Sequence, residues 1–369
     1  MRMMTMKDKS PGDYTILPGS NVKGEEVLSV LVKRSYTLCC DAQIVSRCEE
    51  DNKLLSGDIY YEGENSSVKY ENDFVPVKNK TDVVINAKAY SPTGRPKYTI
   101  FASVQIDNVI KRLLIYGNRW AKKHSFGIIK FSDPAPFIEM DIIYENAYGG
   151  TDNLTDPQIP YAYPRNPIGK GFIINKKNIE PDGFPLPNIE DPKDVLTPQN
   201  ICVKKFENWH YQPVPQGFGW YHKLWHPRVS HAGILPNYRE YEEELRQRYA
   251  KYVPEGKKND YAQTKIPQMN FNYFNGASPG LQLPFLRGDE EITLENLTKE
   301  NNIITFALPN EVPFIQFDFG FGVNDIQPHL HTVMIEVEKK TVDLVWGGSV
   351  NYPGMQWLPE MKVNDLVIE

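Results

Sequence analysis

Residues 144–172 combine four glycines, four prolines and five aromatic residues in one stretch of the chain. Neither a helix nor a hydrogen-bonded strand tolerates glycine and proline at this spacing. A disordered linker would not carry so many rings, because aromatic rings normally need burial. The sequence therefore predicts a long ordered loop, with glycines where φ is positive or the backbone approaches closely: Gly149, Gly150, Gly169 and Gly171. Ordered loops of this length usually serve a function.

The rest of the composition is that of a folded, strand-rich protein. Among 369 residues, 40% are hydrophobic and 12% are aromatic, which is enough for a substantial core. The 21 Tyr and 17 Phe favour strands, and the 29 Pro predict many ordered loops. The net charge of −6 comes from mixed signs, so we expect neither nucleic acid nor a membrane as a partner.

The sequence predicts a cytoplasmic protein. Its first 20 residues lack the apolar segment of a signal peptide, and no run of about 18 apolar residues is present. The four cysteines form no CxxC pair, so zinc-site and redox spacings both fail. Free thiols fit the cytoplasm, and we expect no cofactor and no metal site.

The pattern of strands predicts a mainly β fold with antiparallel, sandwich-like sheets. Apolar runs at 26–39, 82–90, 97–107 and 136–148 read as strands, and the Pro–Gly turn at 91–96 is typical of a hairpin. We expect residues 1–25 to form a flexible lead-in and residues 26–369 to form one large domain. Its expected parts are an N-terminal β unit at 26–148, a loop-rich middle at 149–289 and C-terminal strands at 290–350, with the two strand-rich parts packed together.

One helix is predicted clearly, at 237–252. Its aromatic stripe recurs every three or four residues, and Pro254 ends it: Tyr238, Tyr241, Leu245, Tyr249 and Tyr252. Two interpretations of the stripe stay open, because it can pack on the protein's own body or bind a partner.

The chain offers several candidate chemistries, of which none is complete. Residues 276–280 match the G-x-S-x-G nucleophile motif, but Pro279 lacks the N–H that the oxyanion hole needs. His222 and His226 are four residues apart, as metal ligands on a helix are, yet Pro227 follows directly, which favours a structural loop. The glycines around Lys170 fail the phosphate-loop signature at both ends. We therefore predict no catalytic residues.

Short sequence words along residues 82–346 resemble the bacterial domain-of-unknown-function 2169 family. About eight words occur in the family's order, at 82–96, 117–120, 136–150, 166–172, 186–190, 215–228, 273–277, and 288–290 with 344–346. The chain departs from the family pattern at Asn118, His331 and Gly347, where the family commonly has charged residues, so we expect no charge-based role there.

The resemblance implies a function in protein export. The family is found with type VI secretion genes, and its members resemble adaptors or chaperones for secreted toxic effectors. The expected partners are an effector or its PAAR-type spike-tip domain, and also the trimeric spike protein. An enzyme that uses the aromatic loop region as a substrate pocket is the alternative, and a structural component of the secretion apparatus is a third hypothesis.

The expected partner-binding residues lie in two rigid, aromatic segments. Aromatic and arginine side chains are the usual anchors of interfaces. They are densest at 217–228, with Trp220, Trp225 and Arg228, and the loop around Tyr161, Tyr163 and Arg165 is a second candidate. The competing interpretation is that the tryptophans fill the core beneath the loops.

Overall fold

The computed structural model describes residues 2–4, 12–21, 23, 25–38, 44–156, 158–180, 182–232, 270–318, 323–351 and 365–368. Over these residues the protein is mainly β, as the sequence predicts, with several sheets whose strands pair mostly antiparallel. The helix predicted at 237–252 lies outside the described residues.

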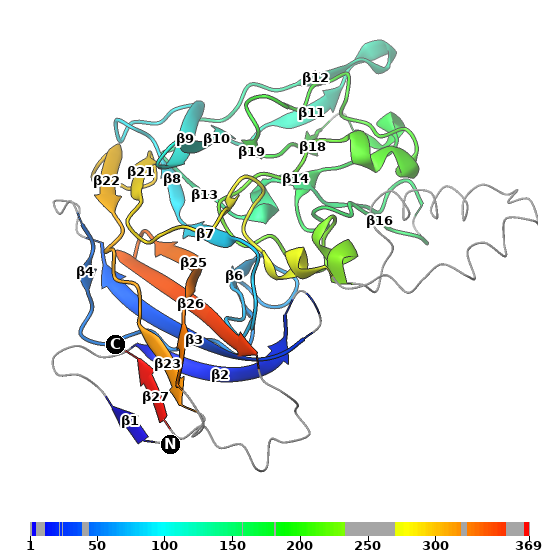
Figure 1. The fold of residues 1–369 in the computed structure, drawn as a ribbon. Coiled ribbons are helices and arrows are strands. Elements are labelled where there is room, and N and C mark those ends of the chain that lie inside the picture. Colours follow the sequence, from blue (N-terminus) through cyan, green and yellow to red (C-terminus); the bar gives the residue numbers. More distant parts are fainter. Residues whose placement is uncertain are drawn as a thin grey trace, which may run out of the picture.

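The central layer is a seven-stranded sheet (Figure 1). Its strands are, in order, β2 (Asp13–Ser20), β3 (Glu26–Thr37), β26 (Thr341–Asn351), β25 (His329–Glu336), β7 (Thr81–Asn86) and β20 (Gln282–Leu283), with β4 (Ser46–Arg47) beside β3. Strands β7 and β25 pair in parallel, with Val83 opposite Val333, and β7 is buried along its whole length. This pair joins the N-terminal β unit to the C-terminal strands, so the expectation that they pack together is confirmed.

A five-stranded antiparallel sheet encloses the main core from the other side. Its strands are β19 (Ile189–Glu190), β10 (Val109–Tyr116), β9 (Thr99–Ile106), β21 (Glu291–Glu295) and β22 (Ile303–Ala307). Ile100 and Val104 of β9 lie in the same buried cluster as Ile85 and Leu344 of the central sheet. Two sheets facing one apolar cluster are the sandwich-like arrangement that the strand pattern predicts.

A third layer covers the start of β3. It is a four-stranded sheet of β1 (Arg2–Met4), β27 (Asp365–Ile368), β23 (Ile315–Asp318) and β24 (Val323–Ile326). Leu28 and Val30 of β3 form a separate apolar cluster with Ile315 and Phe317 of β23. Both ends of the chain therefore lie at this end of the molecule (Figure 1).

Part of the segment expected to be a flexible lead-in, residues 13–20 of 1–25, is an ordered strand. Residues 13–20 form β2, which pairs with β3 over eight residues, from Asp13 opposite Lys33 to Ser20 opposite Glu26. The segment contains Pro18 and Gly19, and β2 is an edge strand, where a missing N–H costs little. Tyr14 packs against the third-layer cluster, which holds the strand in place.

The loop-rich middle has a hydrophobic core of its own. Large side chains from distant loops meet there, including Tyr148, Tyr163, Phe172 and Trp209. Short strand pairs frame it, namely β14 (Tyr148–Gly149) with β17 (Lys170–Gly171), β15 (Thr151–Asp152) with β16 (Tyr161–Ala162), and β12 (Ile129–Phe131) with β11 (Trp120–Lys123) and β18 (Phe184–Pro185). The prediction of a long ordered Gly/Pro/aromatic loop is confirmed, because the loop folds around this second core.

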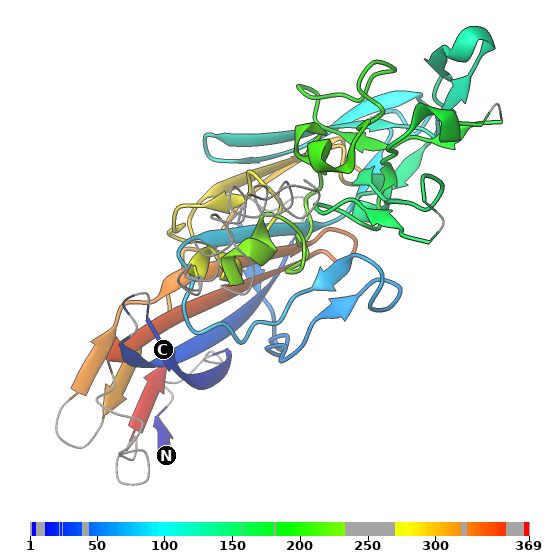
Figure 2. The ribbon, with the colours of Figure 1, turned by 90° about the vertical axis from the view of Figure 1, so that its right-hand side faces the viewer.

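The remaining elements are short. Two further strand pairs are β5 (Ile59–Tyr60) with β6 (Val68–Tyr70) and β8 (Lys88–Tyr90) with β13 (Glu139–Asp141). The described 3-10 helices are η1 (Ser125–Gly127), η2 (Tyr144–Asn146), η3 (Lys176–Asn178), η4 (Phe206–Tyr211), η5 (Arg228–Ala232) and η7 (Phe271–Phe274). No helix in the described part of the chain combines the length and apolar character needed to cross a bilayer. The molecule is elongated, with the β11–β12 hairpin and the chain termini at opposite ends (Figure 2).

Candidate functional site

The two segments expected to bind a partner meet at one place in the structure. The backbone N–H of His226 donates to the Pro164 carbonyl oxygen at 2.9 Å. The Tyr221 hydroxyl lies 2.7 Å from the carbonyl oxygens of both Arg165 and His226. Tyr221 and Arg165 are 56 residues apart in the chain, so no local sequence pattern indicates this contact.

The 161–165 loop is anchored on its inner side by Tyr163 and is partly exposed on its outer side. Tyr163 is fully buried, and its hydroxyl donates to the Pro213 carbonyl oxygen at 3.0 Å. Arg165 donates to the Gln212 carbonyl oxygen at 3.0 Å, and its guanidinium lies 5.2 Å from the centre of the Trp209 ring. Tyr161 and Arg165 keep part of their side chains at the surface, so contact with a partner by these two residues stays a prediction.

The other expected anchors are core residues in this structure. Trp220, Trp225 and Arg228 are each 5% exposed. The Trp225 ring packs edge-to-face against Tyr144, with 5.2 Å between the ring centres, and against Tyr221 at 5.4 Å. This burial favours the interpretation in which the tryptophans fill the core, and partner binding by Trp220, Trp225, Arg228 and the buried Tyr163 stays a prediction.

Arg228 is buried because a carboxylate accompanies it. Its guanidinium forms a two-pronged pair with Glu71, in which Nη1 lies 2.6 Å from Oε2 and Nη2 contacts Oε1. Its remaining donors reach the carbonyl oxygens of Tyr221 and Tyr273, both at 2.8 Å. Burial alone would lower the pKa of Arg228, but the Glu71 carboxylate outweighs burial and raises it. Arg228 thus links Glu71, the residue that follows β6, to the loops that contain Tyr221 and Tyr273.

A second buried ion pair fastens the turn at 276–280. Asp82 of β7 is fully buried, and its Oδ2 lies 2.7 Å from Lys78 Nζ. The same carboxylate accepts hydrogen bonds from the backbone N–H groups of Ala277 at 3.0 Å and Gly276 at 3.1 Å. The turn that resembles a nucleophile motif is therefore held against the central sheet, and the N–H groups of Gly276 and Ala277 are already occupied.

The serine of that turn has a lysine partner that the sequence did not indicate. Lys111 Nζ of β10 lies 2.6 Å from Ser278 Oγ and 2.7 Å from the Pro279 carbonyl oxygen. Burial lowers the pKa of Lys111 to about 7, so its amine is partly neutral near pH 7. Serine–lysine pairs act as nucleophile and base in some hydrolases. Here Ser278 is fully buried and Pro279 offers no N–H, so this pair lacks both access and an oxyanion hole.

Three histidines are buried, at positions 222, 226 and 331. Burial lowers the pKa of His222 and of His226 to about 4, and that of His331 to about 3. Among the residues that the structure describes, no three His, Cys, Asp or Glu side chains come together as metal ligands would. These side chains are therefore neutral members of the packed interior at pH 7.

The surface feature that sequence reasoning missed is the outer face of the five-stranded sheet. Phe101 of β9, Ile110 of β10 and Ile303 of β22 are 45%, 57% and 61% exposed. The strand register places Leu114 opposite Phe101 and Arg112 opposite Ser103. The sequence carried little signal for this face, because the outward phase of β9 is polar apart from Phe101, with Thr99, Ser103 and Gln105 as its other members.

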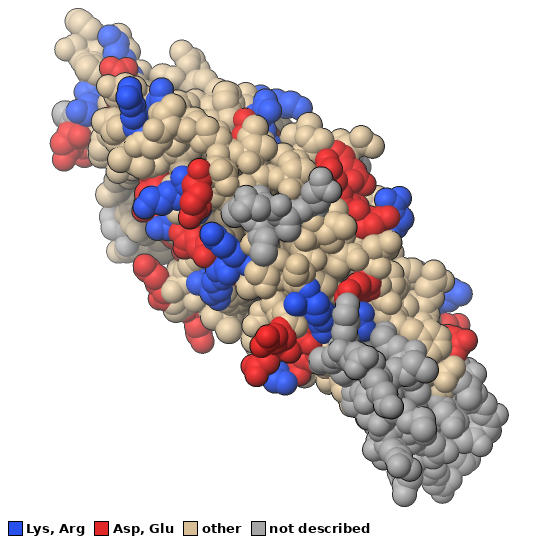
Figure 3. Space-filling view, turned by 90° about the vertical axis from the view of Figure 1, so that its left-hand side faces the viewer, with Lys and Arg blue, Asp and Glu red and all other residues tan. Residues whose placement is uncertain are grey.

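Charged groups do not dominate the visible surface. Figure 3 shows one side of the molecule, on which Lys and Arg mix with Asp and Glu in small groups separated by uncharged areas. On the outer sheet face itself, Arg112 lies 3.9 Å from Glu295 and 5.7 Å from the centre of the Phe101 ring. This face therefore mixes exposed apolar side chains with polar ones and a neutralised charged pair, as the surfaces of protein interfaces often do.

The protein is thus mainly β, and residues from its sequence motifs, such as Asp82 and Arg228, hold the sheets and loops together. The chain matches, over residues 23–347, the model of the family described as an uncharacterized protein conserved in bacteria (DUF2169), and it belongs to this family. No curated protein and no solved structure matches the chain.

Proposed function

We propose that this chain is a non-catalytic cytoplasmic adaptor or chaperone. It binds a type VI secretion effector or its PAAR-type spike-tip domain and aids loading of that cargo for export, where the trimeric spike protein is a further partner. The resemblance to a family found with type VI secretion genes supports this proposal. The description of the matched family names no activity.

The observation on which the proposal depends is the outer face of the five-stranded sheet. Phe101, Ile110 and Ile303 expose large apolar side chains on strands whose backbones are fixed by their neighbours. A rigid strand presents side chains at little entropic cost, and exposed apolar area rimmed by polar groups is typical of protein–protein contact. Polar side chains lie between these apolar ones, because the register places Ser103 and the Arg112–Glu295 pair in the row between Phe101 and Ile110.

The enzyme alternative has one specific observation in its favour, the contact between Lys111 and Ser278. Its expected location, a pocket in the aromatic loop region, is a packed core in which Tyr148, Tyr163 and Trp209 are buried. A cavity of about 190 Å³ lies instead at the end of the sandwich, between Leu297 and Val337. That volume is below the usual size of a small-molecule site, so the alternative ranks second.

Coexpression with the neighbouring effector or spike-tip gene tests the proposal. We expect the cargo's soluble yield to rise and a stable complex to purify. Phe101→Ser combined with Ile110→Ser is expected to remove the complex while the melting temperature stays unchanged, because both side chains are exposed. Leu154→Ser is the matched control, since Leu154 is 58% exposed outside this sheet. A purified cargo that gains neither solubility nor a complex contradicts the adaptor proposal, and labelling of Ser278 by a fluorophosphonate probe supports the enzyme.

A further inference from the structure

The β11–β12 hairpin forms the end of the molecule that lies opposite the chain termini (Figure 2). Ala121 pairs with Phe131 and Lys123 with Ile129 across the hairpin. Ala121 and Ile129 are buried in the second core, which fixes the base of the hairpin. The connecting turn closes with the His124 N–H donating to the Ile128 carbonyl oxygen at 2.8 Å. The tip is therefore a projection held by a rigid base.

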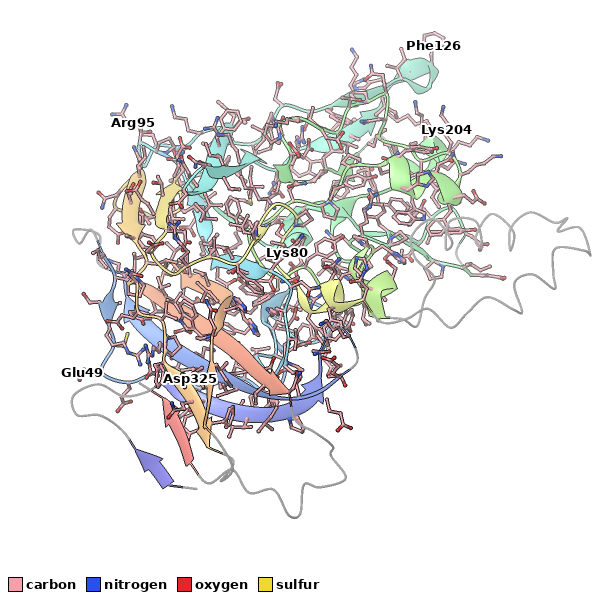
Figure 4. All side chains as sticks on the ribbon, in the orientation of Figure 1. Glu49, Lys80, Arg95, Phe126, Lys204 and Asp325 are labelled. Carbon is pink, nitrogen blue, oxygen red and sulfur yellow. The ribbon has the colours of Figure 1, made fainter. Side chains whose placement is uncertain are left out.

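Phe126 at the tip costs the isolated fold stability through its backbone and adds none through its side chain. Its side chain is 100% exposed, and its backbone has φ 60° and ψ 18°, in the left-handed region. Bulky residues rarely adopt that conformation, for which Gly or Asn is preferred. Figure 4 places Phe126 at the outermost point of the hairpin. Its neighbour Ile128 is also exposed, at 53%. Neither side chain contributes to the core.

The flanks of the same hairpin carry unneutralised positive charge. Lys122 lies directly opposite Lys130 in the strand register, and like charges in that position repel each other. Lys123 adds a third charge on the next position. Among the described ion pairs, none involves these three lysines. A bound carboxylate would relieve the repulsion.

We propose that the hairpin tip is a docking element for a protein partner. Phe126 and Ile128 enter an apolar pocket of that partner, and Lys122, Lys123 and Lys130 pair with carboxylates on the pocket's rim. The two unfavourable features of the tip, an exposed aromatic ring and opposed lysines, both become favourable in such a complex. The proposal rests on the proposed function for the class of partner, an exported protein, and adds the residues that recognise it.

An anionic membrane is the other occupant that lysines and an exposed ring would fit. The chain as a whole carries a net charge of −6, which repels an anionic surface. A single aromatic residue with three lysines also falls short of the two signals that stable membrane anchoring requires. A protein pocket with an acidic rim therefore fits the hairpin better.

Two substitutions separate docking from a structural role. Phe126→Asn suits the left-handed turn, so we expect an equal or higher melting temperature together with at least tenfold weaker binding of the cargo. Lys122→Glu places a negative charge opposite Lys130, so we again expect an equal or higher melting temperature and at least tenfold weaker binding of the cargo. Leu154→Asn is the control, with unchanged binding. If both variants bind the cargo as tightly as the unmodified chain, or if they lose binding only through a lower melting temperature, the proposal is overturned.

A photo-crosslinking residue placed at position 126 in the native bacterium tests docking independently of the cargo's identity. We expect one protein adduct, located on a peptide that combines acidic and apolar residues, and lost in the Lys122→Glu background. The same crosslinker at position 154 is the control. Crosslinking to lipid, cosedimentation of the purified chain with phosphatidylglycerol vesicles, or no adduct above the control overturns the proposal. Absence of any complex with the type VI cargo, with the adduct at 126 intact, contradicts the proposed function alone.

Discussion

The buried pair of Arg228 and Glu71 makes the sharpest prediction about what holds the fold together. Arg228→Met removes the cation and leaves the Glu71 carboxylate buried without its partner. Breaking a buried ion pair on one side costs about 3–5 kcal/mol of unfolding free energy. The upper part of that range applies here, because the carbonyl oxygens of Tyr221 and Tyr273 lose their donor as well.

Urea unfolding followed by tryptophan fluorescence measures this cost, because Trp220 and Trp225 are buried close to the pair in the main core. Combining Arg228→Met with Glu71→Leu removes both charges, and we expect the double variant to be more stable than Arg228→Met alone. Arg287→Met is the control, since Arg287 pairs with Asp289 at an exposed site, and its midpoint is expected to stay unchanged.

The opposite result would restore a surface role for this segment. If Arg228→Met costs less than about 1 kcal/mol, the value typical of an exposed ion pair, then Arg228 is solvated and free to contact a partner. Loss of cargo capture by Arg228→Met at an unchanged melting temperature would lead to the same conclusion. Both outcomes contradict the buried position of the guanidinium described above.

Three further predictions concern stability. Gly149→Val and Gly171→Val are each expected to destabilise the protein by at least about 1–3 kcal/mol in thermal melts, because φ is 153° and 102° and an added Cβ would lie 2.1 Å and 2.8 Å from its nearest neighbour. Burial lowers the pKa of His331 to about 3, so the stability that this residue contributes above pH 6.5 falls by about 1.4 kcal/mol per pH unit as the pH drops toward 3. His222 and His226, whose pKa burial lowers to about 4, add slopes of the same sign, so urea titrations at several pH values should show a shallower pH dependence for His331→Gln than for the unmodified chain. Lys111→Met is expected to be more stable than the unmodified chain at pH 7, since folding lowers the lysine pKa to about 7, and the stability gain of the unmodified chain between pH 7 and 10 should be absent from the variant. Equal melting points for the glycine variants, or identical pH slopes for the other two, would contradict these arguments.

Local patterns in the sequence predicted much of this fold. The apolar runs predicted strands β3, β7 and β9, and the density of Gly, Pro and aromatic residues predicted the ordered loops, because each signal acts within a few residues. Strand β2 was missed because a proline and a glycine interrupt it, which only its edge position explains.

The candidate site was predicted less well, because burial depends on contacts between distant segments. Trp225 and Arg228 are residue types that commonly anchor interfaces. Arg228 is buried because Glu71, 157 residues away in the chain, pairs with it. The contact between Lys111 and Ser278 spans 167 residues and carries no local signal. Phe126 could have been noticed as an aromatic residue beside glycine in a short lysine-rich turn, but its left-handed backbone is a property of the folded hairpin.

The residues that carry the family resemblance are mostly those that hold the layers together. Asp82, Ala277 and Arg228 are buried and hydrogen-bonded within the chain, so they specify the scaffold and leave no side-chain atoms for a partner. The exposed candidates, Phe101 and Phe126, lie in the stretches between those sequence words. A partner can therefore be recognised by residues whose substitution leaves the scaffold intact. We therefore expect that exchanging the 121–131 hairpin for that of another family member transfers partner choice and leaves the melting temperature within a few degrees. An exchanged chain that folds but keeps its original partner would assign recognition to the outer sheet face alone.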